Sequence, residues 1–484
     1  MLREFDFSID GARYFARGEA ISATLSDYLG ARGGGAAWES RGNDLVGVGG
    51  YNGDGHLEVR MVEASRVYLP QLAGKEVMTV ASVAGELGDV ESLMSVLLEG
   101  RPSQRRGLVM TAFETSGREE SGMPGALARQ ISAGGRITFG WESLPVVQRW
   151  ISEARKVGRQ PGDLLRPGAA AARSSFCYED ASGYRFYRCG SMEEVFRLRR
   201  EYPRAQLLNR GFLSGVESMN LDSGRGTGYI ISLEAVAELG GLLDLDHSME
   251  LGAACSMSSV CEAVAGEFPA FAAAIFRSYG RTALHQLSLG GLLASRDRAG
   301  AAGGALLVED AVILLFSQEG EREVPAREFF AGEPVVGDDE LIGGVRLKKP
   351  EGPVEGSLRG HERLRRGRAG AESAMDFFCR VELGAGGEIE NAWLSLASHG
   401  RRPQFLEEVS TEMVGKTWEV EMAKEVTRRI REEADCRDTP AATAKYRQAM
   451  AGALWQKFFF ENPEPGVRRS LQPELEEALK GGAV

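Results

Sequence analysis

Cysteine is scarce in this sequence, and the residues before position 177 contain none. The six cysteines are dispersed at Cys177, Cys189, Cys255, Cys261, Cys379 and Cys436. The closest pair, Cys255 and Cys261, does not have a usual metal-ligand spacing, and the five histidines are equally scattered. A lone cysteine is most often a small buried apolar residue. The sequence therefore predicts no metal site.

Positive charge and long apolar runs are lacking too. The net charge of -12 and the pI near 5.3 argue against nucleic acid as a partner, because phosphate binding needs a basic surface. No apolar run approaches the ~18 residues that span a bilayer, so we expect no membrane insertion. The first six residues lack the apolar core of a signal peptide. A cytoplasmic protein is the expectation.

A chain of 484 residues is too long for one core and should form about three domains of an α+β fold. Composition and periodicity predict strands and turns over 1–80, a helical part over 81–154, a linker over 155–185, an α+β or α/β domain over 186–350, a basic linker over 351–374, a third unit over 375–462 and a tail over 463–484. The glycine-rich stretch 47–50 reads as a joint between strands.

Individual elements can be predicted from caps and periodicity. Ser191 and Glu194 form a capping-box pattern that opens an amphipathic helix, which Pro203 stops. A further core helix is predicted over 89–100. Strands are predicted over 205–208, 229–233, 249–253, 305–316, 377–383 and 388–396, and a later helix should bury Trp418, Met422, Val426 and Ile430 on one face.

Several ordered segments in the carboxyl half carry a family resemblance. They are Tyr229-Ile230-Ile231-Ser232-Leu233 with Ala237-Glu238-Leu239, Leu251 to Ser258, Ser288-Leu289-Gly290-Gly291, Asp339-Glu340-Leu341-Ile342, Val414 to Trp418, and Ala444 to Arg447 with Lys457-Phe458-Phe459. In order and spacing they resemble the small, flavin- and iron–sulfur-containing subunit of xanthine dehydrogenase, of the molybdenum hydroxylase family.

The resemblance implies a degenerate ferredoxin-like β-grasp domain, a degenerate helical [2Fe–2S]-type domain, a two-lobed FAD-binding domain of the PCMH type and a C-terminal α/β domain like that of CO dehydrogenase flavoproteins. Each cluster needs four thiolates. The first-cluster ligand positions fall on Arg41, Val46, Gly49 and near Ser65, and those of the second fall in 103–110 and 136–141. None is cysteine. We therefore expect no [2Fe–2S] cluster.

The flavin loops are altered as well. The resemblance assigns the cofactor-binding positions to Leu207, Leu208, Arg210, Gly211, Gly215, Gly290, Gly291, Leu341, Ile342 and Arg363. Arg210 replaces a family glycine, where a side chain blocks close approach of the backbone to phosphate, although its guanidinium could instead pair with the diphosphate. Leu292 replaces a family asparagine. The apolar frame is kept and polar contacts are lost, so FAD binding stays open.

Three functional hypotheses follow. The first is a structural or assembly pseudo-subunit, without a redox relay, that forms a hetero-oligomer with a molybdopterin-binding large subunit or its paralogue. The second is a flavoprotein that transfers electrons through FAD alone. The third is a small-molecule binding protein that uses the vacated flavin cleft. The sequence contains no convincing catalytic triad or carboxylate pair.

Overall fold

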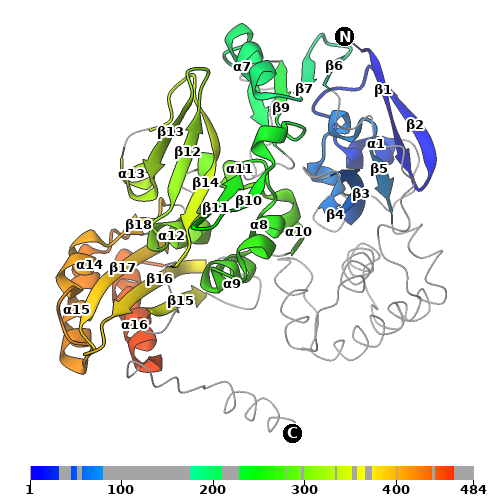
Figure 1. Ribbon diagram of the computed structural model, residues 1–484. Coiled ribbons are helices and arrows are strands. Elements are labelled where there is room, and N and C mark those ends of the chain that lie inside the picture. The colour runs from blue at the N-terminus through cyan, green and yellow to red at the C-terminus, as the bar shows by residue number, and fades with distance from the viewer. Residues whose placement is uncertain are drawn as a thin grey trace, which may run out of the picture.

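The computed structural model describes residues 2–31, 45–51, 57–79, 175–209, 228–279, 281–295, 299–332, 335–350, 357–365, 373–398, 401–438 and 442–462. Strands in this part of the chain form four sheets, and helices lie between and outside them (Figure 1). The α+β class is confirmed. The helix predicted over 89–100, the helical part 81–154 and the tail 463–484 lie outside the described residues.

The amino-terminal unit is a mixed sheet of strand order β2-β1-β5-β3-β4, in which β1 and β5 are parallel. Its first hairpin turns at Asp10 and Gly11, whose φ angles of 49° and 78° suit the Asp-Gly sequence of a tight turn. Its elements are β1 (Glu4–Ile9), β2 (Ala12–Arg17), α1 (Leu25–Ala31), β3 (Leu45–Tyr51), β4 (Leu57–Glu63), η2 (Ala64–Arg66), η3 (Leu69–Leu72) and β5 (Glu76–Met78).

The glycine-rich stretch at 47–50 is not a joint but the middle of strand β3, so that prediction is wrong. Val46 pairs with Val62, and Gly49 pairs with Val59, in the β3–β4 ladder. A Cβ at Gly47 would lie 2.7 Å from Met78 Cε, so glycine here permits close packing rather than a turn. Two predicted cluster-ligand positions therefore lie in a paired strand. Ser65 lies in η2, and position 41 is outside the described residues.

The first lobe of the following domain begins earlier than predicted. Residues 176–188 form a hairpin and not the end of a linker. Tyr178 of one strand pairs with Phe186 of the other, and both side chains are buried, so the two strands share a buried face. The sheet has the order β6-β7-β9-β8. Its elements are β6 (Phe176–Glu179), β7 (Arg185–Arg188), α7 (Met192–Glu201), β8 (Gln206–Leu208) and β9 (Tyr229–Ser232). The helix predicted at the capping pattern is confirmed as α7, because the Glu194 backbone N–H donates to Ser191 Oγ.

The second lobe is an antiparallel sheet of order β10-β11-β14-β12-β13 that is covered by short helices. Its elements are η8 (Ala237–Leu239), β10 (Leu242–Asp244), β11 (Ser248–Gly252), α8 (Met257–Val264), α9 (Pro269–Ser278), α10 (Arg281–Gln286), α11 (Leu289–Ala294), α12 (Gly300–Val308), β12 (Val312–Phe316), β13 (Glu321–Pro325), α13 (Ala326–Ala331) and β14 (Leu341–Lys348).

Helix α12 corrects the strand predicted over 305–316, which begins only at Val312. Residues 301–308 are all buried, and an apolar run buried on every side has no periodicity that distinguishes helix from strand. Its glycines allow close packing. A Cβ at Gly304 would lie 2.6 Å from Phe378 Cε2 in the third unit. Figure 1 shows α12 between the second lobe and that unit.

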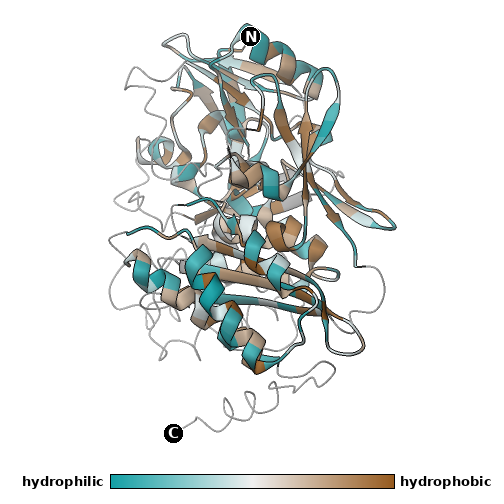
Figure 2. Cartoon of the chain, turned by 90° about the vertical axis from the view of Figure 1, so that its left-hand side faces the viewer, coloured by the Kyte–Doolittle hydropathy of each residue, from teal (hydrophilic) through white to brown (hydrophobic). Residues whose placement is uncertain are grey.

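The third unit has a four-stranded sheet of order β15-β16-β17-β18. The prediction of a basic linker over 351–374 is wrong for residues 357–365. These residues form the edge strand β15, which pairs with β16. The elements are β15 (Ser357–Arg365), β16 (Ser373–Leu383), β17 (Ile389–Ser398), β18 (Gln404–Phe405), α14 (Glu407–Met413), α15 (Val420–Glu433) and α16 (Ala444–Glu461). Met422, Val426 and Ile430 of α15 are buried as predicted, and Trp418 packs just before the helix. Figure 2 shows hydrophobic and hydrophilic residues alternating along these outer helices.

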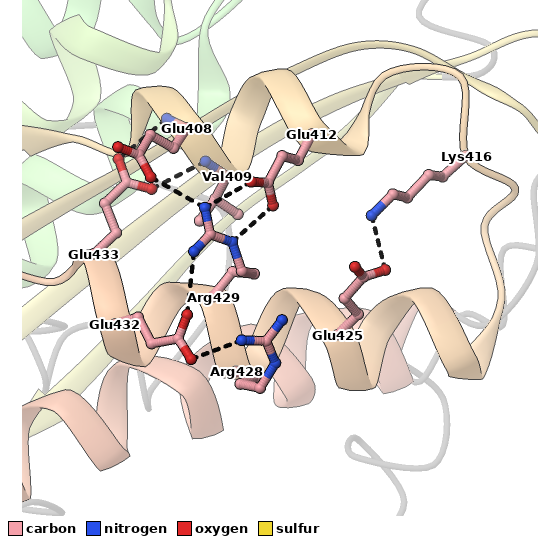
Figure 3. A network of polar contacts seen from close by, with 9 residues as sticks. All are labelled: Glu408, Val409, Glu412, Lys416, Glu425, Arg428, Arg429, Glu432 and Glu433. Atoms are coloured by element: carbon pink, nitrogen blue, oxygen red, sulfur yellow. Dashed lines mark hydrogen bonds and ion pairs between the residues drawn. The ribbon is translucent and has the colours of Figure 1, made fainter.

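Ion pairs join α14 to α15 (Figure 3). Arg429 donates two hydrogen bonds to Glu412, at 2.8 and 2.6 Å, and further ones to Glu408 and Glu432. Glu433 accepts hydrogen bonds from two backbone N–H groups at the start of α14, which have no partner within their own helix. The network therefore fixes one helix against the other.

Candidate functional site

A cavity of about 390 Å³ lies between the two lobes of residues 175–350. Its wall comes from the ends of α7 and β8, from the segment after β9, from the start of α11 and from the loop that leads into β14. The lining residues are Arg199, Leu207, Leu208, Asn209, Leu233, Leu239, Ala253, Ala254, Ser288, Gly290, Gly291, Ala294, Ser295, Val336, Gly337, Asp338, Glu340, Leu341 and Ile342. Apolar side chains dominate, which is usual for a small-molecule site.

The structure brings together six of the ten residues predicted from sequence to hold the cofactor. All six line this cavity, although they come from three separate parts of the chain: Leu207, Leu208, Gly290, Gly291, Leu341 and Ile342. Arg210, Gly211 and Gly215 lie outside the described residues. Six of the predicted positions therefore share one cavity, and their contact with a cofactor stays a prediction.

Arg363 does not belong to this group. It lies in β15 of the third unit, where its Nε is 3.6 Å from Asp376 Oδ1, and the same oxygen is 2.8 Å from His361 Nε2. All three side chains are buried, and the ring of His361 stacks on Phe378 at 4.6 Å. Arg363 is not among the described residues that line the cavity, and it pairs with Asp376 in the third unit. Its predicted contact with a flavin stays a prediction.

The second glycine-rich loop, Ser288 to Gly291, begins helix α11. Ser288 caps the helix, because its Oγ accepts a hydrogen bond from the Gly291 N–H at 3.2 Å. The Gly290 N–H donates to Ala253 O at 2.8 Å, and the Leu289 N–H donates to Cys255 O at 3.1 Å. These amides are therefore already bonded within the protein.

Gly290 is required for packing. A Cβ there would lie 2.8 Å from Ala253 Cβ and 3.0 Å from Ala253 O. The glycine thus allows α11 to approach β11. It is not needed to make room for a phosphate at this point.

Two arginines hold the loop 335–341 that closes one side of the cavity. Arg199 of α7 donates to the backbone oxygens of Glu340, at 2.8 Å, and Asp338, at 2.5 Å. Arg322 of β13 donates two hydrogen bonds to the Glu340 carboxylate, at 2.5 and 2.7 Å. These bonds hold the pKa of Glu340 below its usual value, whereas burial lowers the pKa of Arg199. The loop is thereby tied to both lobes.

Sequence reasoning missed Arg199, Asn209 and Asp338. Arg199 acts on backbone oxygens, and no residue pattern reveals such a contact. Asn209 Nδ2 donates to Ala253 O at 3.3 Å, and its Oδ1 is buried with no hydrogen-bond partner in the described residues. Asp338 lies just before the segment Asp339 to Ile342 that carries the family resemblance, so the resemblance did not include it.

The described wall does not fit the diphosphate of a dinucleotide. The amides at the start of α11 are bonded internally, and Arg199 donates to backbone oxygens. The charged residues of the described lining are Arg199, Asp338 and Glu340, and Glu340 is paired with Arg322 from outside the lining, so these charges balance. An anionic group would meet no net attraction and few donors here. The apolar frame, in contrast, suits a ring system.

In the described residues, no group of three or more His, Cys, Asp or Glu side chains could hold a metal ion. The six cysteines are free thiols, and burial raises the pKa of Cys189 to about 12 and likewise that of Cys261. These thiols are protonated at neutral pH. Within the described residues, no helix is both long and apolar enough to cross a membrane.

Two family matches describe the carboxyl region. Residues 181–350 match the FAD binding domain in molybdopterin dehydrogenase, and residues 362–461 match the CO dehydrogenase flavoprotein C-terminal domain. The two segments together span more than half of the chain. In its domain composition this region is therefore that of a molybdenum-hydroxylase FAD subunit.

Solved structures of the same fold include carbon monoxide dehydrogenase from Hydrogenophaga pseudoflava, which is 19% identical with a TM-score of 0.50 over 56% of this chain and 94% of that chain. Quinoline 2-oxidoreductase from Pseudomonas putida 86 is 19% identical with a TM-score of 0.49 over 57% and 94%. At this identity the likeness describes the fold. No curated protein matches the chain.

Proposed function

We propose that this chain is the xanthine-dehydrogenase-small-subunit-like member of a molybdenum-hydroxylase-type complex and that it has a structural or assembly role instead of relaying electrons. Its partner is a molybdopterin-binding large subunit or a paralogue of one. The two family matches support the assignment to such a complex. The structural role is supported by the residues at the positions where the family resemblance predicts cofactor contacts.

The observation that carries the proposal is the state of the second flavin loop. Its amides bond to Ala253, Cys255 and Ser288 of the same chain, so the described wall offers a diphosphate no set of donors there. The sequence adds that residues 1–176 contain no cysteine. Iron–sulfur clusters of this kind are held by thiolates, so an electron relay through the amino-terminal domains has no ligands.

The amino-terminal sheet supports the ferredoxin-like assignment for residues 1–80. Its strand order, with β1 and β5 parallel at the centre, is that of a β-grasp, and α1 packs beside it. The unit would be a former electron-transfer domain that is kept for its packing against the first lobe.

The test is purification of the chain from its native source under mild conditions, followed by absorption spectroscopy and by iron and flavin analysis. We expect a colourless chain, free of iron, that co-purifies with a large molybdopterin-containing subunit. Two [2Fe–2S] signals in electron paramagnetic resonance of the reduced complex would refute the proposal. So would a chain that associates with no large subunit.

One observation favours the alternative of a flavoprotein without clusters. Six of the residues predicted to bind the cofactor line one cavity. Under that hypothesis the purified complex would be yellow, with stoichiometric FAD and no iron. The same spectrum therefore separates the two hypotheses.

A further inference from the structure

We propose that the cavity between the lobes takes an uncharged, planar ring compound without a phosphate group, in place of a dinucleotide. This inference rests on the proposed function and adds a ligand class for the cavity. The described wall of that cavity offers a diphosphate few hydrogen-bond donors. Three features of the described wall support it: its size, its hydrogen bonding and its charge.

The size fits one ring system. Small-molecule cavities enclose roughly 300–1,000 Å³, and this one has about 390 Å³. It lies at the small end of that range, whereas a dinucleotide exceeds an ordinary drug-sized ligand. The apolar lining residues provide surface for the faces of a ring, and they include Leu207, Leu208, Ala253, Leu341 and Ile342.

The hydrogen-bonding groups of the wall are mostly satisfied by the protein. Ser288 Oγ accepts from the Gly291 N–H, and the Glu340 carboxylate accepts from Arg322 and from the Gly337 N–H. A phosphate group would lose its water contacts here without regaining hydrogen bonds from these groups, which costs free energy. The described wall therefore favours a ligand without a phosphate group.

The charge of the described wall disfavours a phosphate. Asp338 is exposed at the rim, and its backbone oxygen, not its carboxylate, is the group that Arg199 binds. The Glu340 carboxylate is already paired with Arg322. A phosphate carries about two negative charges at neutral pH, and placing it beside the Asp338 carboxylate is unfavourable.

The experiment uses three flavins that share one ring and differ in phosphate content: riboflavin, FMN and FAD. Their binding to the purified full-length chain is measured by fluorescence quenching and by isothermal titration calorimetry. We expect riboflavin to bind at least about tenfold more tightly than FMN or FAD, a difference of roughly 1.4 kcal/mol.

The rim charge is tested with Asp338→Lys, and the matched control is Asp339→Lys. Both residues are exposed neighbours, but only Asp338 lines the cavity. We expect Asp338→Lys to strengthen FMN binding severalfold relative to riboflavin binding, whereas Asp339→Lys changes that ratio by no more than about twofold.

Two results would overturn the inference. One is FMN or FAD binding as tightly as riboflavin to the unmodified chain, which is also the outcome if Arg210 pairs with the phosphate. The other is no riboflavin binding up to about 1 mM. Neither result depends on the large subunit. A chain that binds no riboflavin but co-purifies with that subunit rejects this inference and keeps the proposed function.

Discussion

The substitution Glu234→Gln tests how the amino-terminal unit is held on the first lobe. Glu234 directly follows Leu233, which lines the cavity. Its Oε1 accepts hydrogen bonds from Arg60 Nη2 at 2.5 Å and from Lys75 Nζ at 2.7 Å. The three side chains are at most 10% exposed. The carboxylate therefore links β4 and the start of β5 to the cavity wall.

The expected cost follows from this burial. Removing one partner of a buried ion pair costs roughly 3–5 kcal/mol, because the remaining charge stays desolvated. Burial lowers the pKa of Lys75 to about 7, and Glu234 opposes this shift. Without the carboxylate that pKa falls further, so Lys75 is uncharged in the folded variant at pH 6 as well as at pH 8. We expect a cost of ~3 kcal/mol at pH 8 that rises toward ~5 kcal/mol at pH 6.

Amide hydrogen exchange measured by mass spectrometry gives the local opening free energy for each part of the chain. Exchange should accelerate in peptides from 57–79 and from 229–239, and not in peptides from β16 and β17, which are an internal reference. The matched control is Glu425→Gln, which removes the exposed pair with Lys416. Its expected cost is about 0.2–1 kcal/mol. Equal costs for the two variants would refute the reasoning.

Three further predictions concern the rest of the fold. Because the folded pKa of Lys75 is below its unfolded value of about 10.4, its contribution to stability is lost as pH falls from about 10 to about 7, at up to ~1.4 kcal/mol per pH unit; denaturant titrations of Lys75→Met across this range should lack that slope. Glu433→Ala removes the two hydrogen bonds at the start of α14, and tryptophan-monitored unfolding should show a loss of ~1 kcal/mol. Gly304→Val forces a side chain against Phe378 and should cost ~1–3 kcal/mol in the same assay, whereas an unchanged midpoint would contradict the packing.

Local signals in the sequence predicted the elements that have caps or one-sided periodicity. Helix α7 and the buried face of α15 are examples. The failures at α12 and β3 have a common cause, which is burial on all sides. Helix α12 and strand β3 are rich in glycine and small residues, so their patterns cannot distinguish a turn, a strand and a helix. Only contacts with Phe378 and Met78 explain those glycines.

For the cavity, sequence comparison found the apolar frame and the glycines, because these lie in contiguous motifs. It could not find Arg199 or Arg322, since their partners are about 140 and 18 residues away in the chain. It did not reveal that Arg363 pairs with Asp376, because a position in a motif gives no information on ion pairs across strands. Contacts to backbone oxygens and across units depend on the fold.

The amino-terminal unit shares its core with the first lobe, which explains why it persists without cysteine. Leu2 exchanges backbone hydrogen bonds with Cys177 and Glu179 at the edge of β6. Phe186, Ile230 and Leu208, all at most 4% exposed, pack in one cluster with the side chains of β1 and β3.

Exposing three such side chains would cost up to about 4–9 kcal/mol, which is comparable with the whole stability of a typical domain, about 5–15 kcal/mol. Leu208 also lines the cavity, so deleting the unit would disturb the cleft as well as the core. Under the proposed function the chain relays no electrons, so the unit needs no thiols but still needs its packing against the first lobe. In that case, selection on stability alone is enough to keep this unit without cluster ligands.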